Sequence, residues 1–160
     1  PWLEPRLAYA NAVFADAMIA AGVALEAPKL WQRGLELLAW LLAMETADGR
    51  LSPTPAGGRG PDDPRPGFDQ QPIEVAALAD ACARAAAVDP SPVWPDGVRA
   101  AAAWFQGAND GGQVMWDPQT GGGFDGLHAD GVVNRNQGAE STLAVISTLR
   151  HARRLSLLQR

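Results

Sequence analysis

The 160-residue sequence predicts an all-α fold made of antiparallel helical hairpins. Apolar residues recur at three- and four-residue spacing along five segments, which is the pattern of helices with a buried face. No run of residues alternates apolar and polar side chains as a half-buried strand does. The connections between the segments alternate between short and long, and the short ones are typical of helical hairpins.

Prolines and glycines mark the ends of the first two expected helices. Leu7, Val13 and Met18 follow helical spacing, and Gly22 provides a stop. Pro28 stands where a first helical turn begins, and the apolar pattern after it breaks at residues 48–49, an Asp-Gly pair. The first two helices are therefore expected at residues 5–21 and 28–45.

Similar signals place the last three helices. A third begins at Pro72 and ends before the Asp-Pro-Ser-Pro stretch that starts at Asp89. A fourth begins near Pro95 and continues to Gly107, and a fifth begins near Gln137. The expected ranges are residues 72–88, 95–107 and 137–154.

The polarity of the helices indicates two layers. The second helix carries a polar edge, as a surface helix does, whereas the third and fifth are apolar on nearly every side and are expected to be buried. Long loops at residues 46–71 and 108–136 join the hairpins, and both would emerge at one end. This arrangement predicts part of an α/α toroid. Five helices cannot close such a ring, so we expect the remainder of a larger chain or a second subunit to complete it.

Composition narrows the partners and the location. The hydrophobic fraction of 47% and the length suit one globular domain, residues 1–160, or a fragment of a larger protein. The net charge of −5 argues against nucleic acid, since phosphate binding needs a basic surface. No apolar stretch approaches the roughly 20 residues that cross a bilayer, so no membrane partner is expected. The single cysteine, Cys82, favours a cytoplasmic location.

A weak repeat links the starts of the third and fifth helices. Gln71 precedes Glu74 and Gln137 precedes Glu140 by the same three residues. Either glutamate could simply complement the positive end of its helix dipole. Each, however, lies beside more amides and carboxylates than a helix cap requires, and such a surplus suits a hydroxyl-rich ligand, because every sugar hydroxyl both donates and accepts.

Three stretches resemble a known family: "FDQQPIEVAALADACARA", "WFQGANDGGQVMWDPQTGGGFDGLHADGVVNRNQGAESTLAVISTL" and, more loosely, "RLAYANAVFADAMIAAG". They are similar to the C-terminal helical region of bacterial proteins assigned as glycosyltransferases, in which a six-hairpin, glycosidase-like α/α toroid follows the transferase domain. The resemblance covers nearly the whole chain and implies a function that involves carbohydrates. It does not supply the reaction. Tyr9 and Asn11 match the Tyr-x-Asn of this family.

If the domain is a glycosidase, two carboxylates must flank the scissile bond. Glu74 and Glu140 are the leading pair because they come from helix starts, with Asp125 and Asp69 as further candidates. Asp125 could equally be a turn residue, and Trp116 and Phe124 could equally pack their loop. The candidate substrate-binding residues are Tyr9, Asn11, Gln70, Gln71, Trp116, Phe124, His128, Asn134, Asn136 and Gln137.

The sequence thus predicts a carbohydrate-active domain associated with a bacterial glycosyltransferase, with its cavity at the N-terminal ends of the inner helices. Binding, cleavage and transfer of glycosyl units all stay open. The alternative is a non-catalytic module that binds a glycan or serves as a scaffold for a partner domain. We expect no metal and no cofactor, because the sequence has neither a Cys/His cluster nor a calcium-loop spacing.

Overall fold

The computed structural model describes residues 2–158, which form a mainly helical molecule. The five predicted helices are confirmed, and two small antiparallel hairpins that the sequence pattern did not predict lie in the long connections. The helices are α1 (Ala12–Ala24), α2 (Pro28–Met44), α3 (Pro72–Ala85), α4 (Val93–Phe105) and α5 (Ala139–Leu158). The strands are β1 (Thr46–Ala47) with β2 (Arg50–Leu51), and β3 (Gly126–Leu127) with β4 (Val133–Asn134). A single 3-10 turn, Ala129–Gly131, connects β3 to β4.

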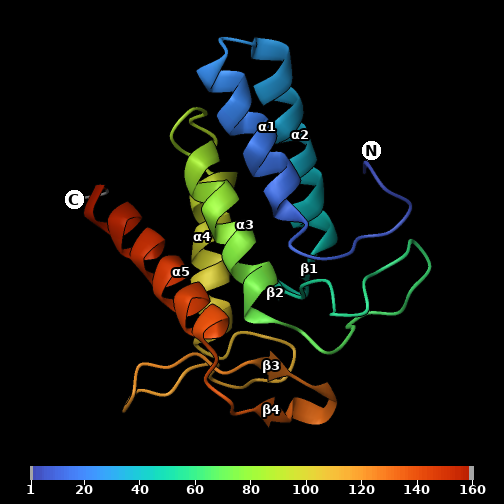
Figure 1. Ribbon diagram of the computed structural model, residues 1–160, viewed down its shortest axis with the longest axis vertical. Helices are drawn as coiled ribbons and strands as arrows, with labels where there is room; N and C mark the ends of the chain where they lie inside the picture. Colours follow the sequence, from blue (N-terminus) through green and yellow to red (C-terminus); the bar gives the residue numbers. More distant parts are fainter. Residues whose placement is uncertain (1, 159–160) are drawn as a thin grey trace.

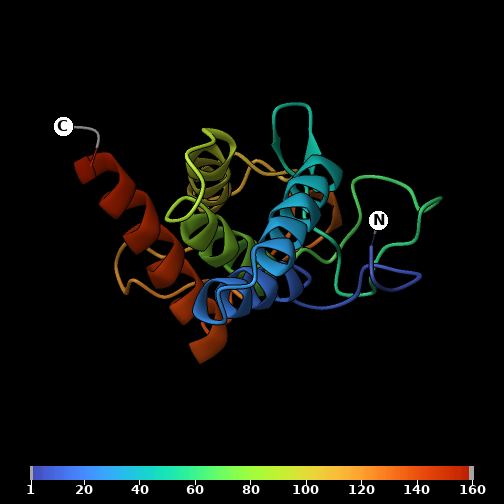
Figure 2. The same cartoon turned by 90° about the horizontal axis from the view of Figure 1, so that it is seen from above.

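Helix α3 is the centre of the packing. It contacts α1, α4 and α5, while α2 packs mainly on α1. Figure 2 shows α3 between α5 on one side and α1 with α2 on the other. Most residues of α3 are buried, among them Val75, Leu78 and Cys82. The alanines between them are small, so three helices can approach α3 closely. The expectation of a buried third helix is confirmed.

Helix α1 begins seven residues later than the predicted range of 5–21. Residues 5–11 had helical apolar spacing, but Leu7 instead exchanges backbone hydrogen bonds with Arg59 in the first long loop. Ala10 then adopts a positive φ of 48°, which no helix continues through. Residues 5–11 therefore form an irregular segment, here called the strap, which pairs with the loop at Leu7, and the helical pattern in it was misleading.

Gly22 lies inside α1 and does not end it, contrary to the prediction. Its role is close approach: a Cβ at this position would lie 2.4 Å from the backbone nitrogen of Trp31. Gly34 on α2 provides the same relief, since a Cβ there would lie 2.8 Å from Ile19. The two glycines let α1 and α2 pack with their backbones near each other.

Helix α5 departs from the expectation that it is buried on all sides. It packs on α3 and α4 through Ala144, Val145 and Thr148, but Leu143 is 66% exposed and Ile146 is 54% exposed. Val13 on α1 is also more than half exposed. Apolar side chains therefore face outward on both helices that flank α3.

The other boundaries differ by only a few residues from the predicted ranges. Helix α3 ends at Ala85 instead of 88, and α4 begins at Val93, so Pro95 lies in its first turn, where no helical N–H bond is lost. The loop 46–71 is packed only in part: residues 51–55 and 59–60 are buried, whereas residues 61–62 and 64–66 are exposed. Within residues 2–158, no helix is long and apolar enough to cross a membrane.

Candidate functional site

The predicted site residues lie at one end of the group of helices. Helices α3 and α5 begin at the lower end of Figure 1, and both long connections emerge there. Contacts from the strap before α1 join these two helix starts, because Ala10 and Asn11 bind Glu74 of α3 and Tyr9 binds Glu140 of α5. Glu74 and Glu140 therefore lie at the same end of the fold.

Glu74 is buried, with a relative exposure of 4%, and its carboxylate is used within the protein. The backbone N–H of Ala10 donates to Oε1. Oε2 accepts from the backbone N–H and the side-chain Nδ2 of Asn11, each at 3.2 Å. Burial raises the pKa of Glu74, while these three donors act to lower it. Glu74 anchors the strap to α3, and Asn11, which is 1% exposed, serves that anchor.

Tyr9 and Glu140 form the exposed part of the same cluster. The Tyr9 hydroxyl donates to Oε2 of Glu140 at 3.0 Å, and the Tyr9 side chain is 57% exposed. The hydrogen bond to Glu140, with partial burial and the charges of Glu140 and Glu74, raises the pKa of the Tyr9 phenol. Of the two leading carboxylates, only Glu140 faces solvent, in the first turn of α5. It can meet a ligand without a rearrangement of the strap.

Asp125 holds the start of α5. Its Oδ1 accepts the backbone N–H of Gly138 at 2.9 Å, and its Oδ2 accepts Nδ2 of Asn136. Desolvation acts to raise the pKa of Asp125, but hydrogen bonds from Ser141, Asn136 and Gly138 bring the pKa below its ordinary value. The Asp125 side chain therefore caps the N-terminus of α5, although it lies in the preceding loop and not next to the helix. Residues 134–137, which come just before this helix, are exposed.

Asp125→Ala should lower the free energy of unfolding by about 1.5 kcal/mol, because the N–H of Gly138 loses its acceptor and Asn136 loses its partner. Urea denaturation followed by circular dichroism measures this loss. Asp62→Ala is the matched control, since Asp62 is an exposed loop aspartate, and it should change stability by less than about 0.5 kcal/mol. Equal stability of the two variants would remove the cap assignment.

Asp69 and His128, two candidates from different loops, form an ion-pair contact. Oδ1 of Asp69 lies 2.6 Å from Nδ1 of His128, and the two side chains are 47% and 37% exposed. A carboxylate at Nδ1 fixes that nitrogen as the donor and leaves Nε2 of the neutral ring as an acceptor. The pair is therefore suited to hydrogen bonding with a hydroxyl group.

Gln70 does not lie at the rim of the site as predicted, because it is fully buried. Its Nε2 donates to Oδ2 of Asp110 at 2.6 Å, and its Oε1 accepts from the indole of Trp104 at 3.4 Å. Its backbone pairs with Leu127 of β3, which ties the start of α3 to the second loop. Gln70 is thus a structural link, whereas the neighbouring Gln71 is half-buried.

Phe124 and Trp116 pack against the core, which was one of the two interpretations of the sequence. Phe124 is 6% exposed, and the Arg135 guanidinium lies 5.3 Å from its ring centroid. Trp116 is partly buried against the core and pairs with Gly123 through its backbone. The buried Phe124 ring therefore presents no open face for a sugar.

The amides before α5 are exposed, and two of them organise the loop. Oδ1 of Asn134 accepts the N–H of Asn136 at 3.1 Å. Gln137 accepts from the hydroxyl of Thr120 at 2.7 Å and donates to Asp117 at 3.2 Å. Asn134, Asn136 and Gln137 therefore lie at the surface in the segment before α5.

A second buried polar cluster was missed by the sequence reasoning. Glu45 and Arg59 are both almost completely buried next to the first long loop. Oε1 of Glu45 accepts the backbone N–H and the hydroxyl of Thr54, while the Arg59 guanidinium donates to the carbonyls of Ser52 and Pro53. The one feature of the sequence that could have indicated this cluster is Glu45, directly after the apolar helix α2. A glutamate in that position looks like an ordinary residue at the end of a surface helix.

Two partly exposed pairs, Tyr9–Glu140 and Asp69–His128, carry hydrogen-bonding groups of the kind that a polyhydroxylated ligand needs. Tyr9, Glu140, Asp69 and His128 offer both donors and acceptors, and Glu140 offers a carboxylate for proton transfer. Among the described residues, no cluster of three or more His, Cys, Asp or Glu side chains suits a metal ion. Neither models of known protein families nor curated protein sequences gave a match to this chain.

Proposed function

We propose that this chain is part of a carbohydrate-active α/α toroid of the kind joined to bacterial glycosyltransferases. The observation that carries the proposal is the exposed Tyr9–Glu140 pair beside buried Glu74, at the end where α3 and α5 begin. A phenol and a carboxylate held together can bind adjacent sugar hydroxyls. In this proposal Glu140 is the candidate acid or base, and Glu74 positions the strap that carries Tyr9.

The ring would be completed by the remainder of a larger chain or by a second subunit. Support comes from the apolar side chains that α1 and α5 expose, Val13, Leu143 and Ile146, because such surfaces usually pack against a partner. The proposed location is the cytoplasm, on the ground that Cys82 is a free thiol.

Replacing Glu140 with Gln tests the proposal. If Glu140 transfers a proton, turnover of α- or β-linked gluco- and manno-oligosaccharides should fall by about 100-fold or more, since general acid–base catalysis supplies that factor. The full-length protein is assayed by release of reducing sugar, and glycan affinity is measured in parallel by calorimetry. Glu36→Gln, on the exposed edge of α2, is the matched control.

The alternative, a non-catalytic glycan-binding or scaffold module, makes a different prediction. A binding module would show no turnover, but its glycan affinity would fall in Glu140→Gln. If the wild-type protein neither turns over nor binds any of these oligosaccharides, the carbohydrate proposal fails and the scaffold reading remains.

A further inference from the structure

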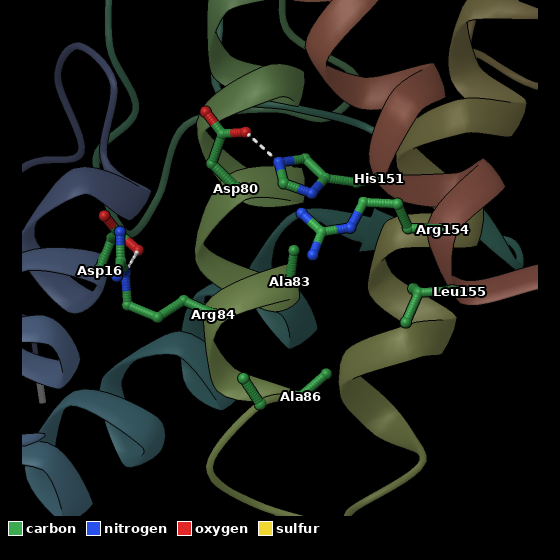
Figure 3. A pocket seen from close by; sticks show the side chains of 9 residues that line it. Asp16, Asp80, Ala83, Arg84, Ala86, His151, Arg154 and Leu155 are labelled. Carbon is green, nitrogen blue, oxygen red and sulfur yellow. Dashed lines mark hydrogen bonds and ion pairs between the residues drawn. The ribbon is translucent and has the colours of Figure 1, made fainter. Parts of the chain in front are cut away.

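A pocket of about 540 Å³ lies away from the candidate site, between the later turns of α3 and α5, and contains none of the predicted site residues (Figure 3). Helix α1 contributes one wall through Asp16, and α5 contributes the opposite wall. The residues that line it are Asp16, Asp80, Ala83, Arg84, Ala86, Ala87, His151, Arg154 and Leu155.

Both carboxylates in this pocket already have partners. Oδ1 of Asp16 lies 2.5 Å from Nε of Arg84, which joins α1 to α3. Oδ1 of Asp80 accepts the hydroxyl of Ser147 and contacts Nε2 of His151, both at 2.8 Å, which joins α3 to α5. Arg84 therefore balances the charge of Asp16, and both aspartates use Oδ1 in these contacts.

Arg154 is the charged group in the pocket that has no such partner. Figure 3 shows its side chain extending from α5 toward α3, with the guanidinium below the His151 ring and beside Ala83. No hydrogen bond or ion pair joins Arg154 to another residue in the described part of the chain. A guanidinium presents a planar fork of N–H donors that fits a carboxylate or phosphate group.

The remaining residues that line the pocket are apolar, and three of the four are alanines with small side chains. Ala83 lies on α3, Ala86 and Ala87 follow the end of this helix, and Leu155 lies on α5. Methyl groups in these positions leave room for a small ring or chain, whose burial would add to affinity. Beside the paired groups Asp16–Arg84 and Asp80–His151, the pocket therefore offers the guanidinium of Arg154 and an apolar floor of Ala83, Ala86, Ala87 and Leu155.

We propose that this pocket binds a small organic anion, whose phosphate or carboxylate lies on Arg154 and whose apolar body lies on the alanine floor. The proposal does not depend on the carbohydrate function, because it uses different residues at a different place in the fold. The ion pairs on either side, Asp16–Arg84 and Asp80–His151, hold the three helices that form the pocket.

Calorimetric titration of the full-length protein tests this site with three probes of similar shape: phenyl phosphate, benzoate and neutral benzyl alcohol. We expect the two anions to bind and benzyl alcohol to bind at least 10-fold more weakly. Tighter binding of phenyl phosphate would identify a phosphate ligand, and tighter binding of benzoate a carboxylate ligand. Equal binding of all three probes, or no binding of either anion, overturns the proposal.

Two variants assign the binding to this pocket. Arg154→Gln should weaken the preferred anion at least 10-fold, and Ala83→Leu should do the same by filling the floor. Arg153→Gln, an exposed neighbour on α5 that does not line the pocket, should bind as the wild type does. Circular dichroism confirms that each variant is folded. If Arg154→Gln binds as tightly as Arg153→Gln, the site is not here. Glu140→Gln should leave anion binding unchanged, which separates this test from that of the carbohydrate proposal.

Discussion

Glu74→Gln should lower the free energy of unfolding by about 3 kcal/mol, because a buried acceptor of three hydrogen bonds becomes partly a donor. The amide can keep one oxygen toward Ala10 or Asn11. Its NH₂ group then faces either the N–H of Ala10 or the two donors of Asn11, so at least one buried donor loses its partner. Hydrogen bonds to a charged group contribute about 1.5–3 kcal/mol each, so the loss is larger than that of a typical surface variant.

Urea denaturation of Glu74→Gln, Glu140→Gln and the wild type measures this effect. Glu140 is the matched control, since it occupies the equivalent first-turn position on α5 but is exposed, and its substitution should cost less than about 1 kcal/mol. Comparable stability of the two variants would show that Glu74 does not anchor the strap. The carboxylate would then be available for the catalytic role that the sequence repeat indicated.

The stability of Glu74→Gln also determines how a loss of activity in this variant is interpreted. If Glu74→Gln loses both stability and turnover, the activity loss follows from movement of Tyr9, which the strap carries. If turnover falls while stability is kept, Glu74 itself meets the substrate. The two glutamates are alike in sequence and differ in surroundings, because Ala10 and Asn11 bury Glu74 under three hydrogen bonds, whereas Glu140 accepts the Tyr9 hydroxyl and stays exposed.

The helices could be predicted because their signals are local. Apolar spacing and the prolines at 28 and 72 lie within each segment, and α2 and α3 begin at these prolines. The start of α1 could not be predicted, because residues 5–11 have the same local pattern as the helix. What excludes them from it is the pairing of Leu7 with Arg59, a contact between residues far apart in sequence.

The candidate site shows the same division between local and distant information. The surplus of polar groups near Glu74 and Glu140 was visible in the sequence, but which of them face solvent was not. Gln70 and Gln71 are neighbours with similar chemistry, and only the backbone pairing with Leu127 places the first in the core. Asp125 was readable as a turn residue, while its function as a cap depends on a helix that begins 14 residues later, at Ala139.

Glu45 should make the protein less stable as pH rises from about 5 to 8. The side chain is fully buried at the end of α2, its Oε1 accepts two hydrogen bonds from Thr54, and its Oε2 has no partner in the described part of the chain. Burial raises the pKa of Glu45 to about 7 from an ordinary value of 4.5, and the nearby charge of Glu74 adds to the shift. The neutral acid is therefore the form that the fold prefers.

The direction of this pH effect follows from where Glu45 binds its proton more tightly, in the folded or in the unfolded protein. Between pH 4.5 and about 7 the folded protein holds the Glu45 proton more often than the unfolded chain does, so the free energy of unfolding falls as pH rises through this window. Below it both states are protonated, and above it both are ionised. The difference between the two pKa values corresponds to about 3 kcal/mol at most across the window.

Replacing Glu45 with Gln keeps the shape of the protonated acid and removes its titration. We expect Glu45→Gln and the wild type to have similar unfolding free energies near pH 5, and the variant to be more stable by about 2–3 kcal/mol at pH 8. Urea denaturation at both pH values gives the difference, in which the titration of all other groups cancels. Glu36→Gln, an exposed glutamate on the same helix, should show no such change with pH. A gap between wild type and Glu45→Gln that is the same at both pH values would mean that Glu45 ionises in the fold as freely as it does in water.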